Sequence, residues 1–202
     1  MKLKTSLLAA ALALASATAS ADILDNSTIN INGSLVPIGA EYVNNATGLD
    51  FLTGGVAGPA DGTMRVGAGS TGSFTLFAYD TPGTIKDIAS FAGFVPIAGF
   101  YNVVSGVNTL TFDLLSLTDI TRTPASGSAL AQLSISGTGM FHLFDGVTTH
   151  HAAGIFTLTT QNKGMTTFSA STVAQVPEPA PLALFGLAGL GLLAARRRKQ
   201  AS

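Results

Sequence analysis

Between residues 22 and 175, apolar and polar positions alternate in short runs that are separated by Gly, Pro, Asn and Asp. This two-residue period, bounded by turn-forming residues, is typical of strands in a half-buried sheet. The clearest run lies at 109–117, where large apolar residues alternate with Thr and Asp. No helical periodicity of convincing length interrupts the pattern. Residues 22–175 are therefore expected to form an all-β domain.

The pattern predicts about nine or ten short strands. Besides alternation at 29–31, they are expected at 73–79, 84–88, 91–101, 109–117, 119–123, 129–136, 138–144, 154–161 and 166–171. Pro96 and Gly99 indicate an edge or bulged strand at 91–101, Gly137 is expected in a turn, and 44–61 is expected to be a long loop. A single β-sandwich or jelly-roll-like domain fits best. A β-solenoid is the alternative, and the lack of a fixed repeat period counts against it.

The first 21 residues have the organisation of a secretory signal peptide. Lys2 and Lys4 supply positive charge, residues 7–15 are apolar, and Ala19 and Ala21 form an A-x-A cleavage site. Cleavage two residues earlier and an uncleaved N-terminal anchor are the alternatives. The segment is expected to direct the chain to the Sec export machinery.

The C-terminal segment, 176–202, combines a proline motif, a short apolar stretch and a cationic cluster. The motif is Val176, Pro177, Glu178 and Pro179, and the cluster is Arg196, Arg197, Arg198 and Lys199. The apolar stretch at 180–195 would form a helix roughly 24 Å long, against about 30 Å for a bilayer core. Snorkelling of the flanking Arg side chains and local thinning of the bilayer would compensate for the shortness of the helix. The adjacent cations are expected to hold the far end of this transmembrane helix in the cytoplasm.

This arrangement resembles the PEP-CTERM sorting signal of exported bacterial proteins. The resemblance rests on Pro-Glu-Pro at 177–179, the apolar helix and the closing Arg cluster. It implies that a membrane protease-transpeptidase, the exosortase, recognises the signal and cuts near the proline motif. It also implies transient anchoring in the cytoplasmic (inner) membrane, then a cell-surface or extracellular location in association with exopolysaccharide. An ordinary C-terminal anchor with a proline-rich neck is the alternative.

The charges between the two terminal segments argue against nucleic-acid binding. The cations of residues 22–175 are Arg65, Lys86, Arg122 and Lys163, against ten acidic side chains. An acidic domain with scattered cations lacks the basic stripe that contacts phosphates. The chain contains no Cys, so this exported domain is expected to fold without disulfide bonds.

Three histidines lie within ten positions, with one Asp among them. His142, Asp145 and His150 are candidate ligands for Zn²⁺ or Cu²⁺. His151 would point to the face opposite His150, so at most one of the two is expected to join His142 across a hairpin. The alternative is a polar surface loop, and no metal or other cofactor is expected.

Enzyme chemistry finds little support in the sequence. Asp113 and Asp119 are candidates for a glycosidase pair by proximity alone, with a solvent-facing strand residue and a turn residue as the alternative. There is no G-x-S-x-G motif, and the G-x-G-x-x-G match at 67–72 has no predicted helix after it, so it is expected to be a turn. The protein is therefore not expected to be an enzyme.

The sequence predicts three parts: a signal peptide at 1–21, a secreted β-rich domain at 22–175 and a sorting signal at 176–202. The expected function is that of an exported structural or adhesive protein of the cell surface or extracellular matrix. The alternative is a secreted carbohydrate- or ligand-binding β-sandwich module. For that alternative, Tyr79 and Tyr101 are the residues whose replacement would test sugar stacking.

Overall fold

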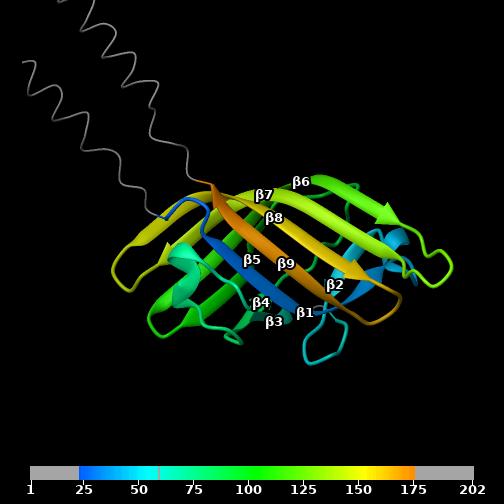
Figure 1. Ribbon diagram of the computed structural model, residues 1–202, viewed down its shortest axis with the longest axis horizontal. Helices are drawn as coiled ribbons and strands as arrows, with labels where there is room; N and C mark the ends of the chain where they lie inside the picture. The colour runs from blue at the N-terminus through cyan, green and yellow to red at the C-terminus, as the bar shows by residue number, and fades with distance from the viewer. Residues whose placement is uncertain (1–22, 59, 176–202) are drawn as a thin grey trace, which may run out of the picture. The chain divides into compact units, whose positions relative to one another are not determined.

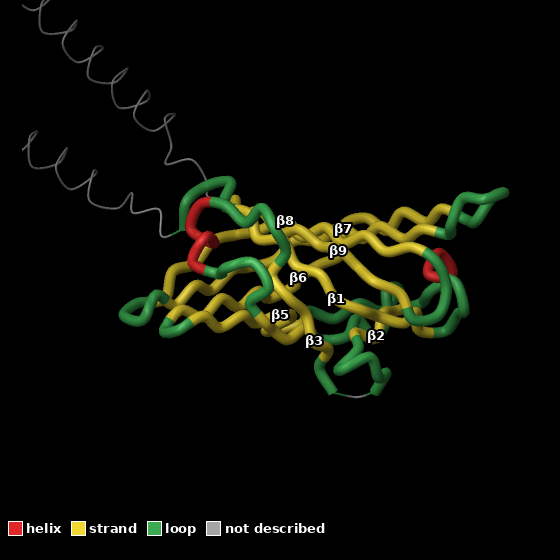
Figure 2. The backbone as a smooth tube through the Cα atoms, turned by 60° about the horizontal axis from the view of Figure 1, so that its bottom comes forward, coloured by secondary structure: helices red, strands yellow, loops and turns green. Residues whose placement is uncertain are grey.

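The computed structural model describes residues 23–58 and 60–175, whose strands follow one another around a single sheet (Figure 1). The strands are β1 (Thr28–Ile38), β2 (Gly48–Phe51), β3 (Gly62–Val66), β4 (Pro82–Ile85), β5 (Ile97–Ser105), β6 (Asn108–Thr123), β7 (Gln132–Phe144), β8 (Thr149–Gln161) and β9 (Thr166–Gln175). Two short 3₁₀ helices, η2 (Val43–Asn45) and η3 (Gly72–Leu76), lie at opposite ends of the sheet (Figure 2).

Eight of the strands form a closed antiparallel barrel, because β1 pairs with β3 on one side and with β9 on the other. The remaining strand, β2, pairs with the second half of β1. The all-β fold class predicted from the sequence is confirmed. Where a sandwich packs two sheets face to face, this fold closes one sheet on itself, and closure removes the unpaired edges that an open sheet would expose.

The barrel interior is filled by aromatic side chains from its long strands. Phe112 of β6 and Phe141 of β7 have ring centroids 4.9 Å apart, and Phe100 and Phe156 pack edge to face at 5.2 Å. Phe74 of η3 adds a ring 4.7 Å from Phe141 and covers that end of the core. All five rings are fully buried, so rings from β5, β6, β7, β8 and η3 form one aromatic core.

Gly137 was expected in a turn, and that prediction is wrong. It lies inside β7, opposite Leu117 of β6 and Phe156 of β8. A Cβ atom at this position would collide with the Ser116 carbonyl oxygen and would lie 2.9 Å from Cδ1 of Leu114. Gly137 therefore serves close packing between strands, and the expected strands 129–136 and 138–144 are one long strand.

The strand expected at 73–79 is also wrong, because residues 72–76 form η3. Phe74 and Phe77, three positions apart, are the buried residues, whereas Leu76 and Tyr79 are exposed. The Ser73 N–H donates to Ser27 Oγ at 2.9 Å, which ties η3 to the chain before β1. The three-residue spacing suits a 3₁₀ turn that covers the end of the barrel.

Other differences arise from irregular pairing. The bulge expected near Gly99 is present, as a register shift between Ile97 and Tyr101, but β5 is an internal strand rather than an edge. The strand β6 replaces two expected strands, at 109–117 and 119–123. Its register shifts follow Leu114 and Leu117. Bulges let a long strand bend around the barrel without leaving the sheet.

The expected loop at 44–61 contains β2 and the last two residues of η2.

The two segments assigned to export lie outside the described residues. They comprise the signal peptide at 1–21 with Ala19 and Ala21, the motif at 176–179, the apolar stretch at 180–195 and the cationic cluster at 196–199. Within 23–58 and 60–175, no helix has the length and apolar character needed to cross a membrane.

Candidate functional site

Rows of Ser, Thr and Asn, with one Asp, run across the outer face of the barrel. Cross-strand pairing aligns two such rows over β6, β7, β8, β9 and β1. The first is Thr121, Ser134, Thr159, Ser169 and Asn32, and the second is Asp119, Ser136, Thr157, Ser171 and Asn30. Neighbouring strands lie about 4.8 Å apart, so the rows form a grid of hydroxyl and amide groups. We call this surface the hydroxyl face.

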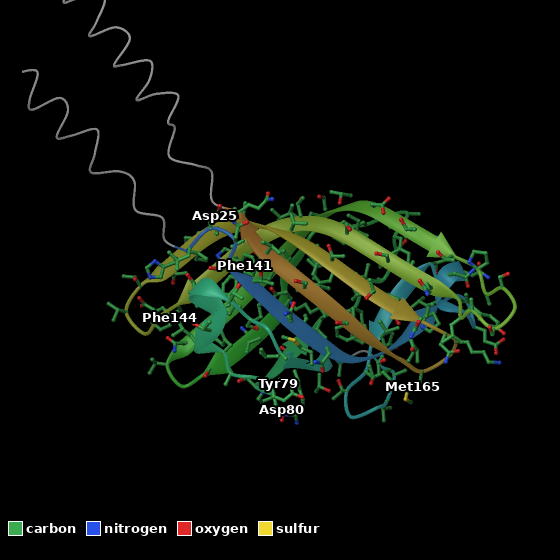
Figure 3. All side chains as sticks on the ribbon, viewed as in Figure 1. Asp25, Tyr79, Asp80, Phe141, Phe144 and Met165 are labelled. Atoms are coloured by element: carbon green, nitrogen blue, oxygen red, sulfur yellow. The ribbon has the colours of Figure 1, made fainter. Side chains whose placement is uncertain are left out.

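The hydroxyl face borders a depression of about 500 Å³. It lies near the turn between β8 and β9, where Figure 3 labels Met165. Thr159, Ser134 and Ser169 line it together with Phe168, whose side chain is buried. Hydroxyl groups donate and accept hydrogen bonds at once. The surface can therefore match the hydroxyl groups of a carbohydrate, and Asp119 is the single charged side chain in its two rows.

A chain of three polar side chains crosses the outer face of β6, β7 and β8. His142 Nε2 lies 2.9 Å from Asp113 Oδ2, and His142 Nδ1 lies 2.8 Å from His151 Nδ1. Asp113 Oδ1 also accepts a hydrogen bond from the Gly99 N–H at 2.6 Å. The bulge at Gly99 thus fixes the carboxylate, and the carboxylate orients His142.

The hydrogen bonds of this chain determine the tautomer of neutral His142. A carboxylate only accepts, so Nε2 of His142 carries the proton and its Nδ1 has a free lone pair. That lone pair accepts the N–H of His151 Nδ1. The direct pairing of His142 with His151 follows from the β7–β8 register, which the sequence pattern alone did not provide.

Asp145 and His150 form a second contact, at the turn between β7 and β8. His150 Nε2 lies 3.0 Å from Asp145 Oδ2, while Asp145 Oδ1 accepts the N–H groups of Thr148 and Val147 at 2.8 and 2.9 Å. The hydrogen bond from Thr148, followed by those from His150 and Val147, lowers the pKa of Asp145 below its ordinary value. Asp145 therefore acts as a cap for the turn.

The candidate metal ligands are divided between these two contacts. Asp145 binds His150, whereas His142 binds Asp113 and His151. Across the described ranges, no three His, Cys, Asp or Glu side chains are arranged to hold one metal ion.

Asp113 and Asp119, the candidate glycosidase pair, both have local partners. Asp113 binds His142 and Gly99, and Asp119 Oδ2 accepts from Thr121 Oγ1 at 2.8 Å. Asp119 lies within β6, not in a turn as expected. The two carboxylates thus orient neighbouring groups of the outer face.

The tyrosines considered for sugar stacking differ in accessibility. Tyr101 lies in the barrel core, where it stacks on Phe112 at 5.2 Å, and burial raises the pKa of its hydroxyl well above the ordinary value. Tyr79 is 72% exposed, and Figure 3 shows it at the periphery of the barrel. Of these two residues, only Tyr79 is placed to contact a sugar ring.

Comparison with protein families decides the character of the C-terminal segment. Residues 175–199 match the PEP-CTERM protein-sorting motif. The chain carries this sorting signal. The motif identifies an exported protein with an exosortase as its processing partner and with C-terminal, membrane-associated anchoring. Comparisons with curated proteins and with solved structures gave no match.

Proposed function

We propose that this PEP-CTERM protein is a non-enzymatic component of the cell surface or extracellular matrix, delivered by an exosortase and held in exopolysaccharide through its barrel. Its N-terminal signal peptide is removed during export through the Sec machinery. Its C-terminal apolar segment anchors it in the cytoplasmic membrane until cleavage near Pro177-Glu178-Pro179. The sorting motif is the observation that carries this proposal.

The position of the motif supports processing directly beside a folded domain. β9 ends at Gln175, and the matched motif begins at the same residue. Pro177 and Pro179 disfavour helix in the residues before them, which favours recognition of the motif by a protease. Because β9 is paired on both sides, cleavage after Gln175 leaves the barrel intact.

The hydroxyl face supports contact with a polysaccharide. Apart from Asp119, its two rows offer uncharged donors and acceptors over β6 to β9 and β1. Each such hydrogen bond contributes only about 0.5–1.5 kcal/mol net, so useful adhesion requires many contacts along one polymer. An extended grid on a rigid barrel provides that multiplicity.

The depression beside Phe168 favours the second candidate function, a carbohydrate-binding module with a defined pocket.

Intact-mass measurement of the protein released from cells tests the sorting proposal. We expect a form that starts near residue 22, ends near residue 179 and carries an added moiety at its C-terminus. Replacement of Pro177, Glu178 and Pro179 by Ala should retain the uncleaved chain in the membrane fraction. Recovery of the unaltered protein only as a membrane form that still contains 180–202 would refute processing.

A further inference from the structure

We propose that the imidazoles of His142 and His151 form a two-nitrogen binding site for a divalent transition metal, with Cu²⁺ preferred, on the outer face of the barrel. Two features of the structure carry this proposal. The facing nitrogens are at a chelating distance, and a carboxylate orients one of the rings. The site does not depend on how the C-terminal segment is processed.

The spacing of the two nitrogens matches a chelate. His142 Nδ1 and His151 Nδ1 are 2.8 Å apart, on directly paired positions of β7 and β8. Two imidazole nitrogens that each bind one metal at about 2.0–2.1 Å are separated by about 2.9 Å at a right angle and by about 3.3 Å at a tetrahedral angle. The observed spacing is thus nearest to a right-angled arrangement.

Asp113 prepares His142 for this role. Its Oδ2 accepts the hydrogen bond from the His142 Nε2–H at 2.9 Å, so the lone pair is on Nδ1, the atom that faces His151. A carboxylate behind a ligating imidazole fixes ring orientation and raises ligand basicity in metal sites generally. The Gly99 N–H holds the other carboxylate oxygen, so this support is anchored in β5. Asp113 is a positioning residue, not a ligand.

His151 supplies the adaptable ligand. Its side chain is exposed, and its ring lies nearly perpendicular to that of His142, at an interplanar angle of 84°. Metal binding requires His151 to move its proton to Nε2 and to turn so that both Nδ1 lone pairs converge. Solvent completes the coordination, since the face is open.

The geometry favours Cu²⁺ over Zn²⁺. Cu²⁺ adopts square-planar or tetragonal coordination with right angles between neighbouring ligands, and it binds nitrogen ligands more tightly than the other first-row divalent ions. Zn²⁺ prefers tetrahedral angles, which would require the two rings to separate. Binding should therefore be weaker for Zn²⁺.

Copper titration of the full chain in detergent, purified without a histidine tag, tests the site by calorimetry and electron paramagnetic resonance. We expect one Cu²⁺ with hyperfine coupling to two imidazole nitrogens, in addition to any Cu²⁺ that the N-terminal amine holds. His142→Ala and His151→Ala should each weaken binding tenfold or more and remove the two-nitrogen signal. Asp113→Asn should weaken binding about 10- to 100-fold. Zn²⁺ should bind less tightly than Cu²⁺.

His150→Ala is the matched control, because His150 neighbours His151 in sequence but binds Asp145 instead. The His150→Ala variant retains the N-terminal amine, which also binds copper, so this background is the same in every variant. Its copper affinity and its electron paramagnetic resonance spectrum should be unchanged. Circular dichroism of every variant verifies folding. A two-nitrogen signal that survives His151→Ala, or that is lost equally in His150→Ala, would overturn the assignment. Failure of the unaltered chain to take up Cu²⁺ would do so as well.

Discussion

Gly139 of β7 and Gly154 of β8 lie directly opposite each other in the barrel wall, and the rings of Phe112 and Phe141 occupy the space that their side chains would take. A Cβ at Gly139 would collide with the Phe112 ring and with the carbonyl oxygen of Asp113. A Cβ at Gly154 would lie 2.6 Å from Cε2 of Phe141 and 3.0 Å from Cε2 of Phe112. The two glycines make the aromatic core possible.

Gly139→Ala should lower the free energy of unfolding by about 1–3 kcal/mol, the usual range for overpacking. The main obstacle is a backbone oxygen, which cannot turn aside as a side chain can. Urea unfolding followed by circular dichroism measures the change. Gly93→Ala, where the nearest atom beyond the adjacent residues is Ser90 Oγ at 3.9 Å, should shift stability by less than about 0.5 kcal/mol. Equal effects of the two substitutions would contradict the packing argument.

Tyr101→Phe should leave the protein equally stable or up to about 1 kcal/mol more stable, because the hydroxyl is buried without adequate compensation. Within the described part of the chain, neither Tyr101 Oη nor Thr172 Oγ1 makes a hydrogen bond of normal geometry, although Thr172 is near enough to Tyr101 to influence its pKa. The stack on Phe112 survives the substitution. A clear loss of stability in the same unfolding measurement would show that the two hydroxyls are properly bonded.

Asp145→Asn should reduce the melting temperature at neutral pH, and the difference should shrink in acid. The pKa of Asp145 is lower in the folded chain than its ordinary value of about 4. Its carboxylate therefore stabilises the fold above that ordinary value, and this contribution is lost as the pH falls through the folded pKa. Melting curves at pH 7 and pH 3 provide the comparison. A difference that is the same at both pH values would disprove the capping role.

Thr157→Val combined with Thr159→Val should weaken co-sedimentation of the released protein with the host's exopolysaccharide by several-fold. Val keeps the shape and strand preference of Thr and removes only the hydroxyl group. The control is Thr149→Val, an exposed Thr of β8 outside the two rows. Equal retention of all three proteins by the polymer would count against the hydroxyl face as the contact surface.

The sequence predicted which residues of the long strands face the core, because Leu110, Phe112 and Leu114 alternate with polar residues and all three are buried. It failed where burial follows another spacing, as for Phe74 and Phe77 in η3. At those positions the end of the barrel needs a cover, and tertiary packing outweighs local alternation.

The candidate sites depended on information that periodicity does not contain. Alternation predicted strands at 129–136 and 154–161, but only the strand register places Ser134 and Thr159 side by side. The same holds for His142, which meets His151 rather than His150. Register is set by turns and bulges over whole strands, so contacts between distant strands could not be derived from short windows of sequence.

Pairing of β9 with both β1 and β8 has a consequence for biogenesis. β9 closes the barrel, and it is synthesised and exported after the other strands of the domain. Until residues 166–175 have left the export channel, β1 and β8 each have an unpaired edge. Open edges pair readily with stray strands. The barrel can therefore close only when the final ten residues of the domain have been exported. A chaperone that covers the unpaired edges of β1 and β8 during secretion would raise the yield of folded protein.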